Sequence, residues 1–189
     1  MRKAVSLAVV IAFLALGAAS AAAQAKPPSK APRPARGQAE EVLAAWNGIG
    51  RKLIAMAEDF PEDKYDFKPN PAQRSFAEQL LHAAGTNYYF TDVVKGQKPG
   101  PEDLPRDKYK TKADVVAAVK KSFADGAAVI TEKGNAGMSQ TVKHPFANQM
   151  THVWALAMDM VEHSGEHYGQ LVVYYRVNNL VPPESRPRK

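Results

Sequence analysis

The 189-residue sequence contains no cysteine. This absence excludes disulfide bonds, catalysis by a thiolate of the protein itself, and attachment of a lipid to a processed N-terminal cysteine. The sequence also lacks a nucleophile elbow of the Gly-x-Ser-x-Gly type, a phosphate-binding loop and a Cys-x-x-Cys pair. The common signatures of serine, nucleotide and thiol chemistry therefore do not decide what this chain does.

Long apolar runs are also scarce, and the clearest one lies near the start. Arg2 and Lys3 precede the apolar run Val5–Leu16, and small residues follow at 21–25. This run is too short for a convincing membrane span, and its flanks predict a secretory signal peptide over residues 1–25. We therefore expect an exported protein, periplasmic or secreted, whose mature form is soluble and has no stable membrane insertion.

The formal net charge of +6 comes from residues outside the predicted folded domain. The six basic residues before Gln38 leave 19 basic side chains to balance the 19 acidic ones. Four of those six lie in a Pro- and Ala-rich segment, residues 26–37, which we interpret as a disordered leader with polyproline character. The remaining chain is nearly neutral and has no basic cluster with interleaved aromatic residues, so we expect no nucleic-acid partner.

Apolar residues recur at spacings of three and four through most of the remaining chain, which predicts helices. A capping-box sequence at Ser75–Glu78 and a capping threonine at 111 mark two of the starts. The predicted helices cover residues 38–58, 75–94, 111 to a break at Gly134–Gly137, and Phe146–Asn178. The sequence thus predicts an all-α four-helix bundle over residues 38–186.

The segment Lys95–Lys110 is a long connector that contains three prolines. Fully extended, it can span roughly 50 Å. It can therefore run back along a helix, which permits the second and third helices to lie parallel to each other.

Three histidines form the candidate functional site. His163 and His167 are four residues apart in the last predicted helix. Four residues rotate about 400° around the helix axis, so both rings leave the same face one turn apart. His82 lies in the second predicted helix and can supply a third ring. Three neutral imidazoles around a divalent ion leave coordination positions for water or substrate, as in catalytic zinc sites. The alternative is that these are buried histidines that only form hydrogen bonds.

The other two histidines are not expected to join this site. His144 precedes a proline in a predicted loop, and His152 lies about 16 Å from His163 along the helix axis. Asp159 and Glu78 each lie four residues before a proposed ligand, where they can orient its ring or add a carboxylate. The alternative for both acids is an ordinary solvated or capping carboxylate.

Gly165 and Gly169 lie inside the last predicted helix, where each costs up to about 1 kcal/mol relative to alanine. Two explanations remain open for them. Their missing side chains can admit a ligand or the other partners of a metal ion, or they can permit tight packing against a neighbouring helix.

The string Glu162–Leu171, with the sequence EHSGEHYGQL, together with Leu80–Ala84, with the sequence LLHAA, resembles the DinB-like (DinB/YfiT-type) superfamily. Its last helix typically carries His-x-x-x-His followed by a Gly-Gln pair, and its second helix carries a lone histidine. The resemblance covers roughly residues 38–186. It implies an up-down-down-up four-helix bundle with a long connector between the second and third helices.

The resemblance also implies a function. Members of the superfamily are described as metal-dependent hydrolases or as transferases that join low-molecular-weight thiols to electrophiles. We therefore expect a divalent ion, zinc or nickel, on His82, His163 and His167, and a small-molecule substrate or ligand. The expected export counts against a thiol cosubstrate. A non-catalytic bundle of the periplasm that binds a metal or a small molecule is the alternative, and dimerisation through exposed bundle faces is left open.

Four tyrosines are candidates for a proton donor or an oxyanion contact near the metal. The alternative is that they fill the ridges of the bundle, which we expect for at least two of them. These residues are Tyr88, Tyr89, Tyr168 and Tyr174.

Overall fold

The computed structural model describes residues 35–187. The predicted signal peptide and the leader up to residue 34 lie outside this range. The α-helices of the described part are α1 (Gln38–Asp59), α2 (Phe76–Val94), α3 (Lys112–Met138) and α4 (Val153–Val177). Among these helices, none combines the length and the apolar character that crossing a membrane requires.

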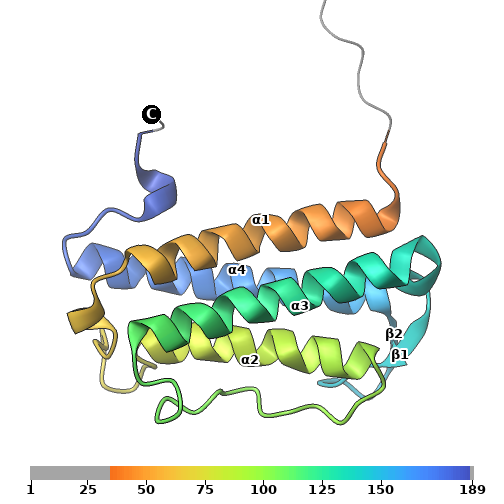
Figure 1. Cartoon of the computed structure of the whole chain (residues 1–189), viewed down its shortest axis with the longest axis horizontal. Coiled ribbons are helices and arrows are strands. Elements are labelled where there is room, and N and C mark those ends of the chain that lie inside the picture. The colour runs from red at the N-terminus through yellow and green to blue at the C-terminus, as the bar shows by residue number, and fades with distance from the viewer. Residues whose placement is uncertain (1–34, 188–189) are drawn as a thin grey trace, which may run out of the picture. The chain divides into compact units, whose positions relative to one another are not determined.

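The helices form a bundle in which α1 and α4 run in one direction and α2 and α3 run in the other (Figure 1). Both α1 and α2 pack against α3 and α4. The connector between α2 and α3 runs back along the bundle before α3 begins, so α2 and α3 are parallel (Figure 1). The predicted all-α bundle with up-down-down-up topology is confirmed.

Two capping boxes start the central helices, as the sequence predicts. The Glu78 amide donates to Ser75 Oγ at 3.2 Å, and the Ser75 amide donates to Glu78 Oε2 at 2.6 Å. Thr111 and Asp114 form the same pair of bonds at the start of α3. Each box satisfies two amides that the first helical turn leaves without a backbone acceptor.

The predicted start of the last helix at Phe146 is wrong. Two short strands, β1 (Thr141–Lys143) and β2 (Met150–His152), form an antiparallel hairpin before α4. In the hairpin, backbone amides and carbonyls of β1 form hydrogen bonds with those of β2. The His144 amide also donates to the Gln149 carbonyl oxygen at 2.8 Å. The helix therefore begins at Val153 and ends at Val177, one residue before the predicted end at Asn178.

The predicted break of the third helix falls inside α3 rather than at its end. Gly134 has φ 55°, a left-handed conformation that glycine adopts without strain, and the chain bends there. The helical backbone is therefore interrupted at Gly134, as predicted, and a short further helical stretch continues to Met138.

The contact between α1 and α3 is close and largely apolar. Trp46 is fully buried there, and its indole Nε1 donates to the Phe123 carbonyl oxygen at 2.9 Å. A Cβ atom at Gly126 would lie 2.0 Å from Trp46 Cζ2, and one at Gly50 would lie 2.8 Å from Phe123 Cδ1. The two glycines therefore provide the space into which the aromatic rings fit.

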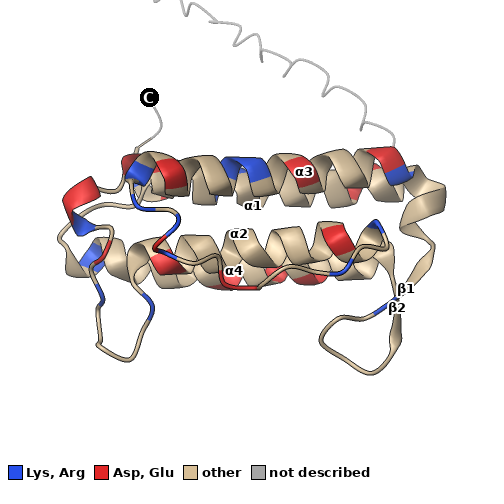
Figure 2. Cartoon of the chain, turned by 60° about the horizontal axis from the view of Figure 1, so that its bottom comes forward, with Lys and Arg blue, Asp and Glu red and all other residues tan. Residues whose placement is uncertain are grey.

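Charged residues of both signs are interspersed along the helices and the connector (Figure 2). Several form exposed ion pairs between elements, including Lys120 with Glu58 and Arg186 with Asp59. Such exposed pairs contribute little to stability individually.

Candidate metal centre

The three predicted histidines meet at one place between α2 and α4. His163 Nε2 lies 3.2 Å from His82 Nε2 and 3.1 Å from His167 Nε2. One ring nitrogen from each histidine lies within 4.8 Å of the others. Nitrogens bound to one tetrahedral ion at about 2.0–2.1 Å lie about 3.3 Å apart, so the spacing fits a shared ion.

Two of the rings are held by hydrogen bonds on the side away from this meeting point. His82 Nδ1 lies 2.9 Å from Asp103 Oδ1, and His167 Nδ1 lies 2.7 Å from Gln79 Oε1. Both partners are acceptors, so each Nδ1 carries the proton and each Nε2 presents a lone pair to the centre. A single proton on His163 Nε2 can form a hydrogen bond with only one of these lone pairs, whereas a cation can bind all three nitrogens.

Burial keeps two of the imidazoles, His163 and His167, in the neutral form that binds metals. His167 is 5% exposed, and desolvation, followed by the neighbouring His163 and His82, lowers its pKa to about 3. Desolvation is also the main cause that lowers the pKa of His163, with His82 next. Both rings are therefore neutral at neutral pH, which metal coordination by imidazole requires.

A chain of amides and hydroxyls orients His167. Gln79 Nε2 donates to Gln170 Oε1 at 2.6 Å and lies 3.4 Å from the Tyr174 hydroxyl, so Gln79 Oε1 faces His167. The Tyr174 hydroxyl donates in turn to the Arg74 carbonyl oxygen. Gln170, which follows the histidine pair in the sequence motif, thus acts by fixing the amide that holds His167.

The other three candidate tyrosines make contacts elsewhere, which supports the packing alternative for them. The Tyr88 hydroxyl lies 3.4 Å from the Ala118 carbonyl oxygen. The ring of Tyr89 stacks on Phe146, and Lys52 lies over the ring of Tyr168. Of the four, Tyr174 is the one that contacts the hydrogen-bond network of the centre.

Asp103, which the sequence analysis did not identify, holds His82 from the connector. The Arg74 guanidinium binds the same carboxylate through Nε and Nη2, at 3.2 and 3.3 Å. Burial opposes ionisation of Asp103, but Arg74 and His82 together lower its pKa below the ordinary value. The connector reaches this position because Gly85 has no side chain: a Cβ atom there would lie 2.0 Å from the Glu102 carbonyl oxygen.

The remaining histidines and acids lie outside the centre. Asp159 pairs with His144 Nε2 at 3.3 Å, so the hypothesis that Asp159 supports His163 is wrong. His152 occupies the N-cap position of α4 without a side-chain capping bond, is exposed, and its Nδ1 lies 2.9 Å from the Ser139 carbonyl oxygen. Glu78 caps α2 and pairs with Lys68, as the capping alternative predicts.

The two glycines of α4 have open space around them. A Cβ atom at Gly165 or Gly169 would meet no heavy atom of a neighbouring element within 4 Å. The explanation by tight helix packing is therefore wrong.

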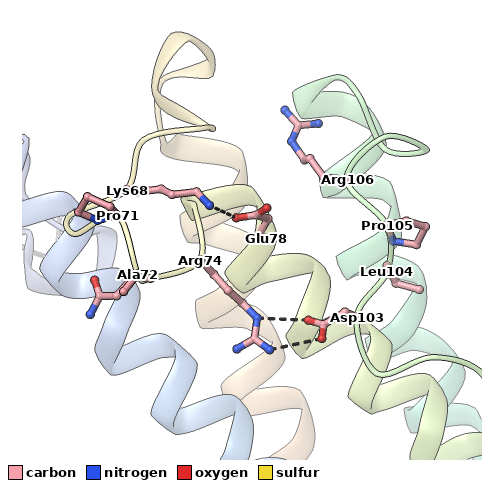
Figure 3. A pocket seen from close by; sticks show the side chains of 10 residues that line it. Lys68, Pro71, Ala72, Arg74, Glu78, Asp103, Leu104, Pro105 and Arg106 are labelled. Atoms are coloured by element: carbon pink, nitrogen blue, oxygen red, sulfur yellow. Dashed lines mark hydrogen bonds and ion pairs between the residues drawn. The ribbon is translucent and has the colours of Figure 1, made fainter.

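A cavity of about 420 Å³ lies beside the centre, between the segment that precedes α2 and the connector. Arg74 pairs with Asp103 in its lining, and Lys68 pairs with Glu78 (Figure 3). Its lining consists of Lys68, Pro71, Ala72, Gln73, Arg74, Glu78, Asp103, Leu104, Pro105 and Arg106. Asp103 thus touches both the cavity and a ring of the centre.

Solved structures share this architecture. A DinB-like protein from Bacillus subtilis, YjoA, is 19% identical with a TM-score of 0.61, and the match covers 79% of this chain and 99% of that protein. YfiT from Bacillus subtilis, described as a probable metal-dependent hydrolase with an unusual four-helix bundle topology, is 15% identical with a TM-score of 0.60, over 79% of this chain and 94% of YfiT. A DinB-like protein from Bacillus cereus is 14% identical with a TM-score of 0.59, over 76% and 95%.

At these identities the solved structures establish the fold alone. No curated protein matches the chain significantly. The family model of the DinB superfamily matches residues 45–171, a range that contains all three histidines of the centre. The chain therefore belongs to the DinB superfamily.

Proposed function

We propose that His82, His163 and His167 bind one divalent ion, zinc or nickel, and that the protein is a metal-dependent hydrolase of a small molecule. The observation that carries the proposal is the convergence of three ring nitrogens from two helices, at 3.1 and 3.2 Å. The description of YfiT as a probable metal-dependent hydrolase points in the same direction.

When bound, such an ion supplies Lewis acidity to water or to a substrate carbonyl group. The protein's own contribution is to hold the ligands. Asp103 and Gln79 fix the tautomer and orientation of two rings, and burial keeps His167 unprotonated. Three imidazoles fill three coordination positions, which leaves room for a reactant, in contrast to closed structural zinc sites with four protein ligands.

Hydrolysis is preferred over thiol transfer because we expect the protein to be exported, whereas thiol cosubstrates are chiefly cytoplasmic. Fractionation of cells that express the full chain tests the export. Mature protein in the periplasm or medium, shortened by about the length of a signal peptide, supports it. Full-length protein that remains in the cytoplasm contradicts it and reopens the thiol route.

Metal content and turnover test the proposal together. Protein purified without an affinity tag should contain close to one divalent ion per chain by elemental analysis. It should hydrolyse members of an ester and amide panel, lose this activity with a chelator, and regain it with zinc. The variant His167→Ala should contain no ion, whereas the control His152→Ala removes a histidine outside the centre and should retain it.

Each other outcome favours a different function. Turnover that requires an electrophile and a thiol together indicates the transferase. Stoichiometric ion without turnover on any panel indicates a metal-binding or storage protein. No ion in the wild-type protein, even after incubation with zinc or nickel, contradicts the proposal altogether.

A further inference from the structure

The cavity near the histidines has a mixed lining, in which each basic side chain pairs with an acidic one. Its basic side chains are Lys68, Arg74 and Arg106, and its acidic ones are Glu78 and Asp103. The apolar residues Pro71, Leu104 and Pro105 line the same cavity. A lining of this kind suits a small molecule that has an apolar body and a single anionic group.

The two arginines of the cavity differ in how many of their nitrogens are free to donate to a ligand. Arg106 binds Asp66 through Nε and Nη2, at 2.8 and 3.1 Å, and donates from Nη1 to the Tyr109 carbonyl oxygen. All three of its nitrogens are therefore engaged. Arg74 binds Asp103 through Nε and Nη2, and among the described residues Nη1 has no hydrogen-bond partner. Arg74 thus has donors left for a ligand.

Arg74 is also linked to the metal centre through Asp103. Its partner Asp103 accepts from His82 Nδ1 through Oδ1, the oxygen that Arg74 Nε binds. A single side chain, Asp103, therefore links Arg74 to His82.

We propose that the substrate is a small carboxylate, which places its carboxylate group on Arg74 and its apolar body against Leu104 and Pro105. The assignment of this molecule as the substrate rests on the proposed hydrolase function. Guanidinium is suited to the recognition because its fixed fork matches the two oxygens of a carboxylate. A divalent ion on the histidines would add positive charge near the cavity, which would attract an anion further.

A purely structural role for Arg74, as the group that holds Asp103 in place, is the competing explanation. The two roles make different predictions about ligands. A structural arginine affects charged and neutral ligands equally, whereas a carboxylate-binding arginine affects the charged ligand alone.

Calorimetric titration with hippurate and with its neutral amide, hippuramide, separates these roles. The two probes share the aromatic body and the internal amide, and they differ in the carboxylate. We expect the metal-free wild-type protein to bind hippurate about tenfold more tightly than hippuramide, the effect of one charge-assisted hydrogen-bonded pair. The variant Arg74→Gln should bind both probes equally, and Arg74→Lys should retain part of the preference.

The matched control is Arg106→Gln. This substitution removes the other arginine of the same cavity and thereby breaks its ion pair with Asp66. It should keep the preference for hippurate within about threefold of the wild-type ratio, since that arginine is already engaged. Circular dichroism and thermal unfolding establish that each variant is folded. Equal binding of the two probes by the wild-type protein, or loss of the preference in Arg106→Gln but not in Arg74→Gln, overturns the proposal.

Because these titrations use metal-free protein, they separate this proposal from the proposed function. Hippurate preference that depends on Arg74 in a protein that never binds an ion supports the carboxylate site and contradicts the metal centre. An intact metal centre in a protein with no preference for hippurate supports the metal centre and contradicts the carboxylate site.

Discussion

Two helix contacts of the bundle, that of α1 with α3 and that of α2 with α4, differ in the side chains that they bury. Between α1 and α3, Trp46 and Phe123 fill space that glycines leave, and the side chains are matched by shape. Between α2 and α4, His82, His167 and Gln79 are buried and matched by hydrogen bonds. The first contact stabilises the fold through apolar burial, whereas the second uses buried volume for groups that attract a cation.

The difference shows how one bundle separates stability from function. Apolar burial at the first contact is favourable by itself. Polar groups at the second contact are costly to bury unless each has a partner, and a bound ion would be the partner of the three Nε2 atoms. Substitutions at the first contact should therefore alter the free energy of unfolding, and substitutions at the second should alter metal affinity.

The largest expected effect is the loss of a ligand at the polar contact. His167→Ala should weaken zinc binding by more than about 100-fold, because even the partners of metal ligands are worth 10- to 100-fold. Competition with a chromophoric chelator measures this affinity. The control His144→Ala removes a histidine that pairs with Asp159 and should leave zinc affinity unchanged. Equal zinc affinity in His167→Ala and the wild type would break the comparison.

Overpacking at the apolar contact should have the next largest effect. Gly126→Ala places a Cβ atom 2.0 Å from Trp46 Cζ2, and the buried ring has to move. We expect a loss of about 3 kcal/mol in the free energy of unfolding, at the upper end for overpacked cores. Urea denaturation measures it, with Gly48→Ala as the control because a Cβ atom at Gly48 would meet nothing within 4 Å. An unaltered midpoint for Gly126→Ala contradicts this account of the contact.

Removal of the Asp103 charge, which holds His82, should have a smaller effect on zinc affinity. Asp103→Asn keeps the shape of the side chain but loses the carboxylate that accepts from His82 Nδ1. Zinc affinity should fall about tenfold, as for other partners of metal ligands. Asp66→Asn is the matched control, because Asp66 forms the same two-bond pair with Arg106 without contacting a histidine of the centre. An equal loss in both variants would show that the connector acts only structurally.

The acid response of the metal-free protein should sharpen the comparison further. His167 has a pKa of about 3 in the folded protein and 6.5 as a free side chain, so the unfolded chain binds the proton first as the pH falls. The free energy of unfolding should therefore decrease below about pH 6.5, by at most about 1.4 kcal/mol per pH unit from this group. The lowered pKa of His163 acts in the same direction.

Urea denaturation at pH 7, 6 and 5 measures this slope. His167→Gln should flatten it, and the control His152→Gln, at an exposed site, should not. A slope that is identical in the wild type and in His167→Gln would show that protonation of this ring is not linked to unfolding.

The smallest effect should come from a pair of buried serines. Ser164 is fully buried, and its hydroxyl has no hydrogen-bond partner among the described residues, whereas Ser122 donates to the Val119 carbonyl and accepts from Asn87. Ser164→Ala should be neutral or stabilising, and Ser122→Ala should cost about 1 kcal/mol. Urea denaturation compares them. A larger loss for Ser164→Ala than for Ser122→Ala would contradict the hydrogen-bond assignment.

Much of the fold could be predicted because its signals are local. The capping boxes at Ser75 and Thr111 depend on residues within one helical turn, and the structure confirms both. The start of α4 was missed because the hairpin before it depends on pairing between Thr141–Lys143 and Met150–His152, which apolar spacing does not reveal.

The centre could be predicted only in part for the same reason. The spacing of His163 and His167 is local to one helix. His82 was predicted as a histidine inside another helix, and a resemblance that spans separated motifs supported this choice. Asp103 and Arg74 come from loops, and their contacts with each other depend on how the connector crosses Gly85. A single sequence carries no local signal for that crossing.

X-ray absorption at the zinc edge, on tag-free protein reconstituted with one equivalent of zinc, tests the metal centre most directly. The account predicts three imidazole nitrogens at about 2.0–2.1 Å and one further light ligand. It also predicts that His82→Ala lowers the number of imidazoles to two. A wild-type spectrum with fewer than three imidazoles, or one that His82→Ala leaves unaltered, would contradict a site built from both helices.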